Sequence, residues 1–309
     1  MSFATIDSPS ARQYYRSDPA DLNKRVWQAY TDEVRLYWKQ SRSGVLKLLL
    51  ICAVIFVVFY LMFSMSPIPQ DPQYHNFADK RQFIGIPNCL DVLSNFLFLW
   101  GGVYGIYVLM WRSGDAFIFR RDSVGHVDYS DQIPWWVLFL SSSLISVGSA
   151  YYHWNPTTQT LFWDRLPMTI SFMSVVDIII AERISSTTAR RLFLPLLLIG
   201  VGSVLWWEIT ERFGSGDLRL YVVVQIAPML LTPLMIGLYP DVYTHSIMML
   251  NTLVCYIVAK AAEHYDHEIF ALTYNTVSGH TLKHLVSGYG LMWLPYMLTH
   301  RRPVDYKQK

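Results

Sequence analysis

Charged side chains are scarce in this sequence of 309 residues, because Asp, Glu, Lys and Arg make up only 16% of it. Soluble domains carry about 25% charged residues, whereas 52% of this chain is hydrophobic. The composition therefore favours a membrane protein. The net charge of +2 comes without a basic cluster that stands out from its surroundings, so nucleic acid is not an expected partner. Protein partners do not follow from the sequence.

Paired cysteines are also missing. The three cysteines, Cys52, Cys89 and Cys255, are far apart and form no CxxC motif. Cys52 and Cys255 lie inside apolar segments, which favours buried small hydrophobic side chains over a disulfide framework.

Long apolar runs are what the chain has instead. The first, at 44–65, has the roughly 20 residues that cross a bilayer, and it lies too far from the N-terminus to be an ordinary signal peptide. Seven more runs follow, at 87–111, 134–153, 160–181, 191–210, 218–238, 245–262 and 280–298. The 11 Trp and 20 Tyr fit the aromatic belts that anchor spanning helices at the interface. We therefore predict an all-α, polytopic membrane bundle.

The distribution of basic residues predicts how this bundle is oriented. Eight spans place both termini on one side, and basic residues are frequent in the arm at 1–43 and in the tail at 301–309. The loop at 262–279 has acidic residues and no Lys or Arg. The positive-inside rule then predicts that both termini are cytoplasmic.

Three histidines, an aspartate and a serine fall at one level of this predicted topology. His153 ends an outward-running span, and Asp164 begins the next one, running inward. His280 and His284 begin the last span on the same, non-cytoplasmic side. Their i, i+4 spacing places both imidazoles on one face of a helix. Ser149 lies one helical turn before His153 and shares its face.

Three histidines with an open fourth position are a standard set for catalytic zinc. Bound water would reach a pKa of about 7 and provide a hydroxide nucleophile. Asp164 would take up the proton of that water and return it to the leaving amine, or orient a ligand histidine. The Ser149 hydroxyl would donate to the developing oxyanion or to Asp164.

Simpler interpretations stand beside this one. Single histidines at helix ends more often bond a carbonyl than a metal, and Ser149 also suits close helix packing. The oxygen-rich group of Asn88, Asp91, Ser94 and Asn95 suits calcium, but it suits hydrogen bonds between helices as well, and we favour the latter.

The motifs resemble those of the alkaline ceramidases, which belong to a wider group of seven-helix membrane hydrolases that includes the progestin and adiponectin receptors. The shared pattern is a serine four residues before a histidine, an aspartate eleven residues after it, and HxxxH on the last helix. The surrounding phrases are Gly-Ser-Ala-Tyr-Tyr-His-Trp-Asn-Pro (148–156), Leu-Phe-Trp-Asp-Arg-Leu-Pro-Met-Thr (161–169), Ser-Gly-His-Thr-Leu-Lys-His-Leu (278–285) and Gly-Ile-Pro-Asn-Cys-Leu-Asp-Val-Leu-Ser-Asn (85–95).

The resemblance covers about residues 70–300 and implies a seven-helix core with zinc on three histidines, hydrolysing ceramide to a sphingoid base and a fatty acid. The chain would divide into a cytoplasmic arm (1–43), an added spanning helix (44–65), the catalytic core (66–300) and a cytoplasmic tail (301–309). The family also implies a calcium site, with Asn88, Asp91 and Asp79 as the candidate ligands. Here Asn88 replaces a family glutamate, and the segment at 74–79 lacks the family's acidic, Trp-containing motif.

We therefore expect a zinc-dependent amidohydrolase of ceramide-like membrane lipids, with a role in sphingolipid metabolism. It would lie in the endoplasmic reticulum or Golgi of a eukaryote, or in the inner membrane of a bacterium. The first alternative is a receptor or sensor with structural zinc and little or no hydrolysis. The second is a transporter, which predicts polar residues across the whole thickness, whereas here they gather at one face.

Overall fold

A computed structural model describes residues 28, 31–32, 42–112, 119 and 131–304. These residues form helices and no β-strand, apart from two isolated bridges. The helices are α3 (Arg42–Phe63), the 3-10 helix η1 (Pro72–His75), α4 (Cys89–Leu93), α5 (Phe96–Arg112), α6 (Ile133–Trp154), α7 (Thr158–Arg183), α8 (Ser186–Arg212), α9 (Arg219–Leu238), α10 (Met248–His264), α11 (Asp266–Leu272) and α12 (Gly279–His300). The predicted all-α class is confirmed.

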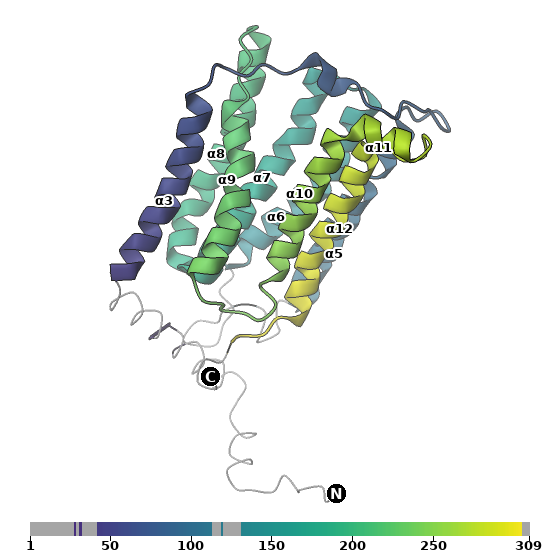
Figure 1. Cartoon of the computed structure of the whole chain (residues 1–309). Coiled ribbons are helices and arrows are strands. Elements are labelled where there is room, and N and C mark those ends of the chain that lie inside the picture. The colour runs from purple at the N-terminus through teal and green to yellow at the C-terminus, as the bar shows by residue number, and fades with distance from the viewer. Residues whose placement is uncertain (1–27, 29–30, 33–41, 113–118, 120–130, 305–309) are drawn as a thin grey trace, which may run out of the picture.

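The apolar runs correspond closely to the long helices. Five stretches are long and apolar enough to cross a membrane, namely Gly44–Phe63, Cys89–Trp111, Ile133–Trp154, Ser186–Arg212 and Arg219–Leu238. They indicate an integral membrane protein. Helices α7, α10 and α12, the other three predicted spans, are not among these five, but they lie alongside the others in the same bundle (Figure 1).

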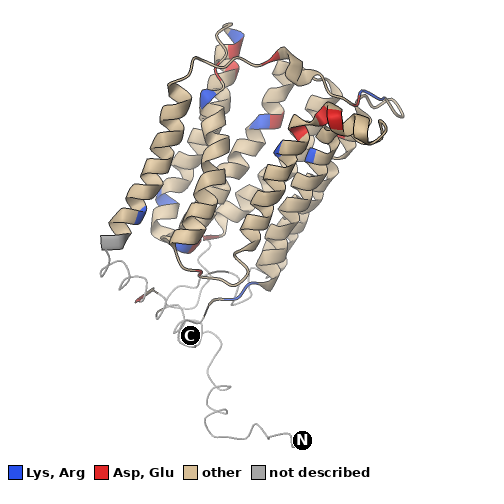
Figure 2. Cartoon of the chain, in the orientation of Figure 1, with Lys and Arg blue, Asp and Glu red and all other residues tan. Residues whose placement is uncertain are grey.

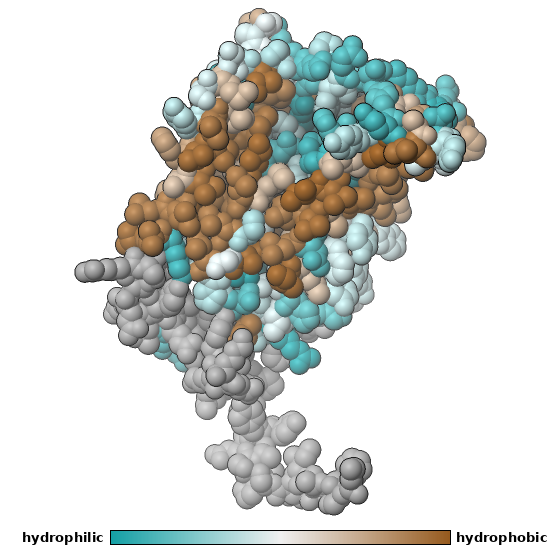
Figure 3. Space-filling model, viewed as in Figure 1, coloured by the Kyte–Doolittle hydropathy of each residue, from teal (hydrophilic) through white to brown (hydrophobic). Residues whose placement is uncertain are grey.

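The helices α5, α6, α7, α9, α10 and α12 follow one another around the bundle, and α12 closes it by packing against α5. Helix α8 packs on α7 and α9, while α3 packs on α9 at the outside (Figure 1). Most side chains of α3 are exposed and apolar, and brown, hydrophobic residues cover much of the visible bundle surface (Figure 3). Such a surface suits a hydrocarbon environment.

The beginning of α3 and the end of α12 lie at the same end of the bundle (Figure 1). This agrees with an even number of crossings. Charged residues lie mostly towards the two ends, with a group of acidic residues around α11 at the opposite end (Figure 2). Which end faces the cytoplasm stays a prediction, as do the organelle and the roles of the predicted arm and tail.

Two parts of the fold carry detail that the prediction lacks. The predicted span at 87–111 is present as the stretch Cys89–Trp111, but it has a break between α4 and α5, where Ser94 and Asn95 turn their side chains back to the carbonyl of Asp91. The predicted loop at 262–279 contains the short helix α11. Nearly all of the arm at 1–43, most of the basic loop at 112–133 and the tail beyond residue 304 lie outside the described residues.

Candidate metal centre

Three histidines from two helices meet near the end of the bundle that carries α11. His153 lies in the last turn of α6, and His280 and His284 lie in the first two turns of α12. All three side chains are buried, and each offers a nitrogen within 4.8 Å of those of the other two. This is the one group of at least three His, Cys, Asp or Glu residues with metal-binding spacing among the described residues. The structure therefore confirms that these predicted ligands come together.

The distances fit a shared ion. Nε2 of His153 lies 3.2 Å from Nε2 of His280, and two ligands of a tetrahedral zinc, at about 2.0–2.1 Å from the metal, stand roughly 3.4 Å apart. Nε2 of His284 is buried without a hydrogen-bond partner. A buried nitrogen of this kind is destabilising unless it is satisfied by a ligand. The donor set and its geometry thus fit a metal ion.

Neighbouring groups hold the two α12 histidines in place. Nδ1 of His284 lies 2.8 Å from Oγ of Ser94 and 3.1 Å from the carbonyl oxygen of Asp91. These contacts leave Nε2 for the centre of the triad. The backbone N–H of His280 donates to Asp266 of α11 at 2.7 Å. Such outer contacts fix the ring orientation of metal-binding histidines.

The loop before α4 covers the triad. The ring of Phe77 lies 4.6 Å, between centroids, from the rings of both His153 and His280. In η1, His75 contacts the hydroxyl of Tyr152 at 2.8 Å through Nδ1 and that of Thr158 at 3.2 Å through Nε2. Burial, with the nearby Arg165 guanidinium, lowers the pKa of His75. His75 is therefore neutral near pH 7 and ties this cover to α6 and α7.

Ser149 and Asp164 also come together, as predicted. The two side chains lie at the contact between α6 and α7, close enough for the Ser149 hydroxyl to interact with the Asp164 carboxylate. Gly148 makes this approach feasible, because a Cβ there would lie 2.1 Å from the backbone oxygen of Trp163. Both side chains line a cavity that also reaches His284.

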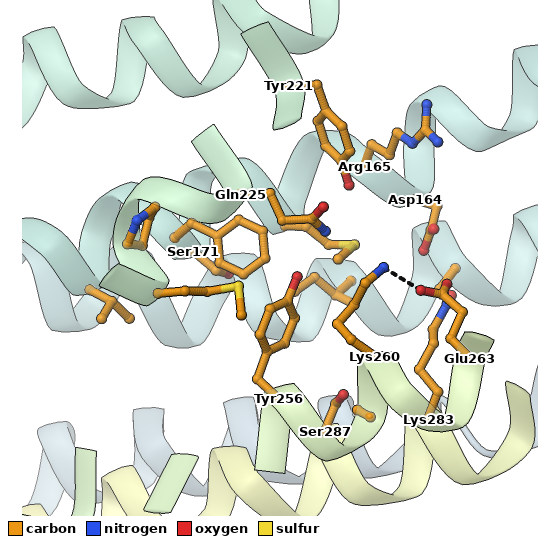
Figure 4. A pocket seen from close by; sticks show the side chains of 18 of the residues that line it. Asp164, Arg165, Ser171, Tyr221, Gln225, Tyr256, Lys260, Glu263, Lys283 and Ser287 are labelled. Carbon is orange, nitrogen blue, oxygen red and sulfur yellow. Dashed lines mark hydrogen bonds and ion pairs between the residues drawn. The ribbon is translucent and has the colours of Figure 1, made fainter. Parts of the chain in front are cut away.

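The two basic residues beside the site, Lys283 and Arg165, have different partners. Lys283 pairs with Glu263 at 2.8 Å and lies 3.0 Å from Nε2 of His280. Asp164 points towards Glu263 and Lys283 across the cavity (Figure 4). Arg165 forms an ion pair with neither Asp164 nor Glu263, and its guanidinium lies instead among aromatic rings.

The candidate calcium ligands each contact other protein groups. Asn88 donates to the carbonyl oxygen of His153 at 2.8 Å, and Asp79 pairs with Arg81 at 2.6 Å. Asp91 accepts from Thr281 at 2.6 Å and from Ser278 at 3.2 Å. The favoured alternative, hydrogen bonds between helices, is therefore confirmed for Asn88 and Asp91, and a calcium site stays a prediction.

A cavity of about 420 Å³ runs through the bundle from this site. Its polar end includes Ser149, Asp164, Lys283 and His284, and it continues between α6, α7, α9, α10 and α12 to Leu294. From Lys283 to Leu294 the helical rise is roughly 16 Å. Most of the lining is apolar, with polar side chains such as Gln225 and Tyr256 midway (Figure 4). The cavity has the shape and lining of a site for a long apolar molecule.

No family model, no curated protein and no solved structure matches the chain. Functional inference thus depends on the motifs and on the geometry of the site.

Sequence reasoning singled out the triad, Ser149 and Asp164, but not what surrounds them. It placed Ser94 among residues that bond between helices, without naming His284 as its partner, and it assigned no role to Phe77 or Asp266. No local signal marks these residues, because each acts across a contact between segments distant in sequence.

Proposed function

We propose that the protein is a zinc-dependent membrane amidohydrolase that cleaves the amide of ceramide-like lipids to a sphingoid base and a free fatty acid. The observation that carries the proposal is the buried histidine triad, one member of which, His284, lines a long, mostly apolar cavity. The motif resemblance to the alkaline ceramidases supports the same reaction. It also implies the seven-helix core, here α4–α5 together with α6, α7, α8, α9, α10 and α12, with α3 as the added helix.

His153, His280 and His284 would hold the zinc. Bound zinc would supply a hydroxide nucleophile near neutral pH and polarise the amide carbonyl. No fourth His, Cys, Asp or Glu joins the group in the described part of the chain, and an open position of this kind favours catalytic over structural zinc. The same observation argues against the receptor alternative.

Asp164 is the residue we assign to proton transfer. Its carboxylate lines the cavity together with the Ser149 hydroxyl. It would accept a proton during attack and return it to the leaving amine nitrogen. The Ser149 hydroxyl would orient this carboxylate.

The cavity supports a lipid substrate. An amide beside Asp164 and His284 would leave its apolar chain along Ile145, Leu291 and Leu294.

The test measures zinc content and release of fatty acid from a fluorescent ceramide by the purified wild-type protein and by His280→Ala. His264→Ala is the matched control, since His264 is an exposed histidine at the same end of the bundle. We expect one zinc per chain and turnover in the wild type and the control, and loss of both in His280→Ala.

Zinc without turnover would favour the receptor or sensor. A folded wild-type protein without zinc would refute the metal centre. Equal loss of turnover in His264→Ala would show that the effect is not specific to the triad.

A further inference from the structure

Arg165 follows Asp164 on α7 and is enclosed by aromatic rings. Its guanidinium carbon lies 4.4 Å from the ring centroid of Trp207, 4.7 Å from that of Tyr221 and 5.5 Å from that of Tyr74. The residue is only 5% exposed. Aromatic faces attract a cation, but they accept none of its N–H groups in ordinary hydrogen bonds.

The guanidinium therefore has unused donors. In the described part of the chain Arg165 forms no hydrogen bond and no ion pair, and its Nη1 is buried without a partner. A buried cation normally binds a carboxylate that compensates for its lost hydration. Other buried arginines of this protein follow that rule, since Arg183 pairs with Asp241 and Arg301 pairs with Glu182. Arg165 is the exception.

Arg165 also lines the cavity that leads to the metal centre. Figure 4 shows it beside Tyr221, near Asp164 and on the opposite side of the cavity from Lys283. The same cavity offers a long apolar lining below it. A ligand that satisfies both features has an anionic group at one end and a long apolar chain at the other.

We propose that Arg165 binds the anionic group of an amphiphile, a carboxylate or a phosphate, whose chain occupies the cavity. The planar guanidinium suits both anions, because its parallel N–H groups match two oxygens. The source of the anion rests on the proposed function. In that reaction, a bound phosphate would be the head group of the lipid amide, and a bound carboxylate would be that of the released fatty acid.

The experiment measures direct binding to zinc-free protein in neutral detergent by isothermal titration calorimetry. The probes are dodecyl phosphate, dodecanoate, neutral dodecanol and inorganic phosphate. Removing zinc first ensures that the anions are not bound by the metal. We expect either or both anionic amphiphiles to bind at least tenfold more tightly than dodecanol and inorganic phosphate. Tighter binding of dodecyl phosphate would identify the anion as a lipid head group, and tighter binding of dodecanoate would identify it as the fatty-acid product.

Arg165→Gln removes the charge and should weaken the anionic amphiphiles at least tenfold, to the level of dodecanol. Arg165→Lys should retain part of the affinity, because it keeps the charge but loses the planar geometry. Arg212→Gln is the control, since Arg212 is an exposed arginine at the same end that pairs with Glu208 outside the cavity. It should bind as the wild type does.

Equal binding of dodecanol and the anions by the wild type would overturn the proposal even if no variant folds. Unchanged affinity in a folded Arg165→Gln would also overturn it. Because binding is measured without zinc, His280→Ala should bind normally. A protein that binds anions through Arg165 but hydrolyses no amide would refute the proposed function alone.

Discussion

Replacing Gly148 by alanine tests whether the contact of α6 with α7 builds the site. The added Cβ would lie 2.1 Å from the backbone oxygen of Trp163, whereas ordinary contact begins at 3.4 Å. The two helices would have to separate by 3.4 − 2.1 = 1.3 Å along this line. Backbone provides the obstacle, so no side-chain rotation relieves it. Overpacking of this kind destabilises by about 1–3 kcal/mol, against a helix-propensity gain of about 0.5–1 kcal/mol.

The larger effect is expected on activity. Ser149 and Asp164 flank the point of contact, and a misplacement of about 1 Å lowers rates by roughly 100-fold. We expect Gly148→Ala to retain zinc, to melt at or below the wild-type temperature in detergent, and to release fatty acid about 100-fold more slowly.

Gly202→Ala on α8 is the matched control for this substitution. Nothing lies within 4 Å of the Cβ it would add, so the change should stabilise or have no effect. If Gly148→Ala matched Gly202→Ala in both melting temperature and rate, the close approach would not position the site.

Two further predictions concern single contacts. Ser94→Ala removes the hydroxyl that lies 2.8 Å from Nδ1 of His284. It should weaken zinc affinity about 10–100-fold, as measured by chelator competition. The control Ser143→Ala, away from the triad, should leave zinc affinity unchanged. Hydrogen bonds from Arg219 lower the pKa of Asp217 to about 2, so this carboxylate stabilises the fold above its ordinary pKa of 3.8, and the contribution is lost as the pH falls towards 2. The difference in melting temperature between wild type and Asp217→Asn should shrink between pH 4 and pH 2; a constant difference would contradict the assignment.

The long helices and the triad are predictable from the sequence for separate reasons. Apolar runs of about 20 residues mark helices in lipid, since every backbone group must bond within its own segment. The triad follows because His153 ends one run while His280 and His284 begin another, and topology places both helix ends at one level. Even the favoured role of Asn88 and Asp91, hydrogen bonds between helices, follows from polar residues inside an apolar run.

The supporting contacts are not predictable in this way. Asp266 caps His280 across 14 residues only because the short α11 turns it back towards α12. Gly279 permits this, since a Cβ there would lie 2.7 Å from Cα of Asp266. Seven-residue helices carry too little periodicity to be recognised. Likewise, the aromatic enclosure of Arg165 depends on Trp207 and Tyr221 from two other helices.

The balance of polar groups distinguishes residues that serve the fold from those that serve a ligand. Asp79, Asp217 and Glu263 are all paired with bases, as expected where buried charge supports structure. Nε2 of His284 and Nη1 of Arg165 are buried without partners, and each such group destabilises the protein by about 1–3 kcal/mol. His284 and Arg165 line one cavity, and His153 contacts the ring of His284. Since an unsatisfied polar group in an apolar bundle is unfavourable for folding, these two groups are best explained by the ligands that would complete them, a metal ion at Nε2 of His284 and an anion at Arg165.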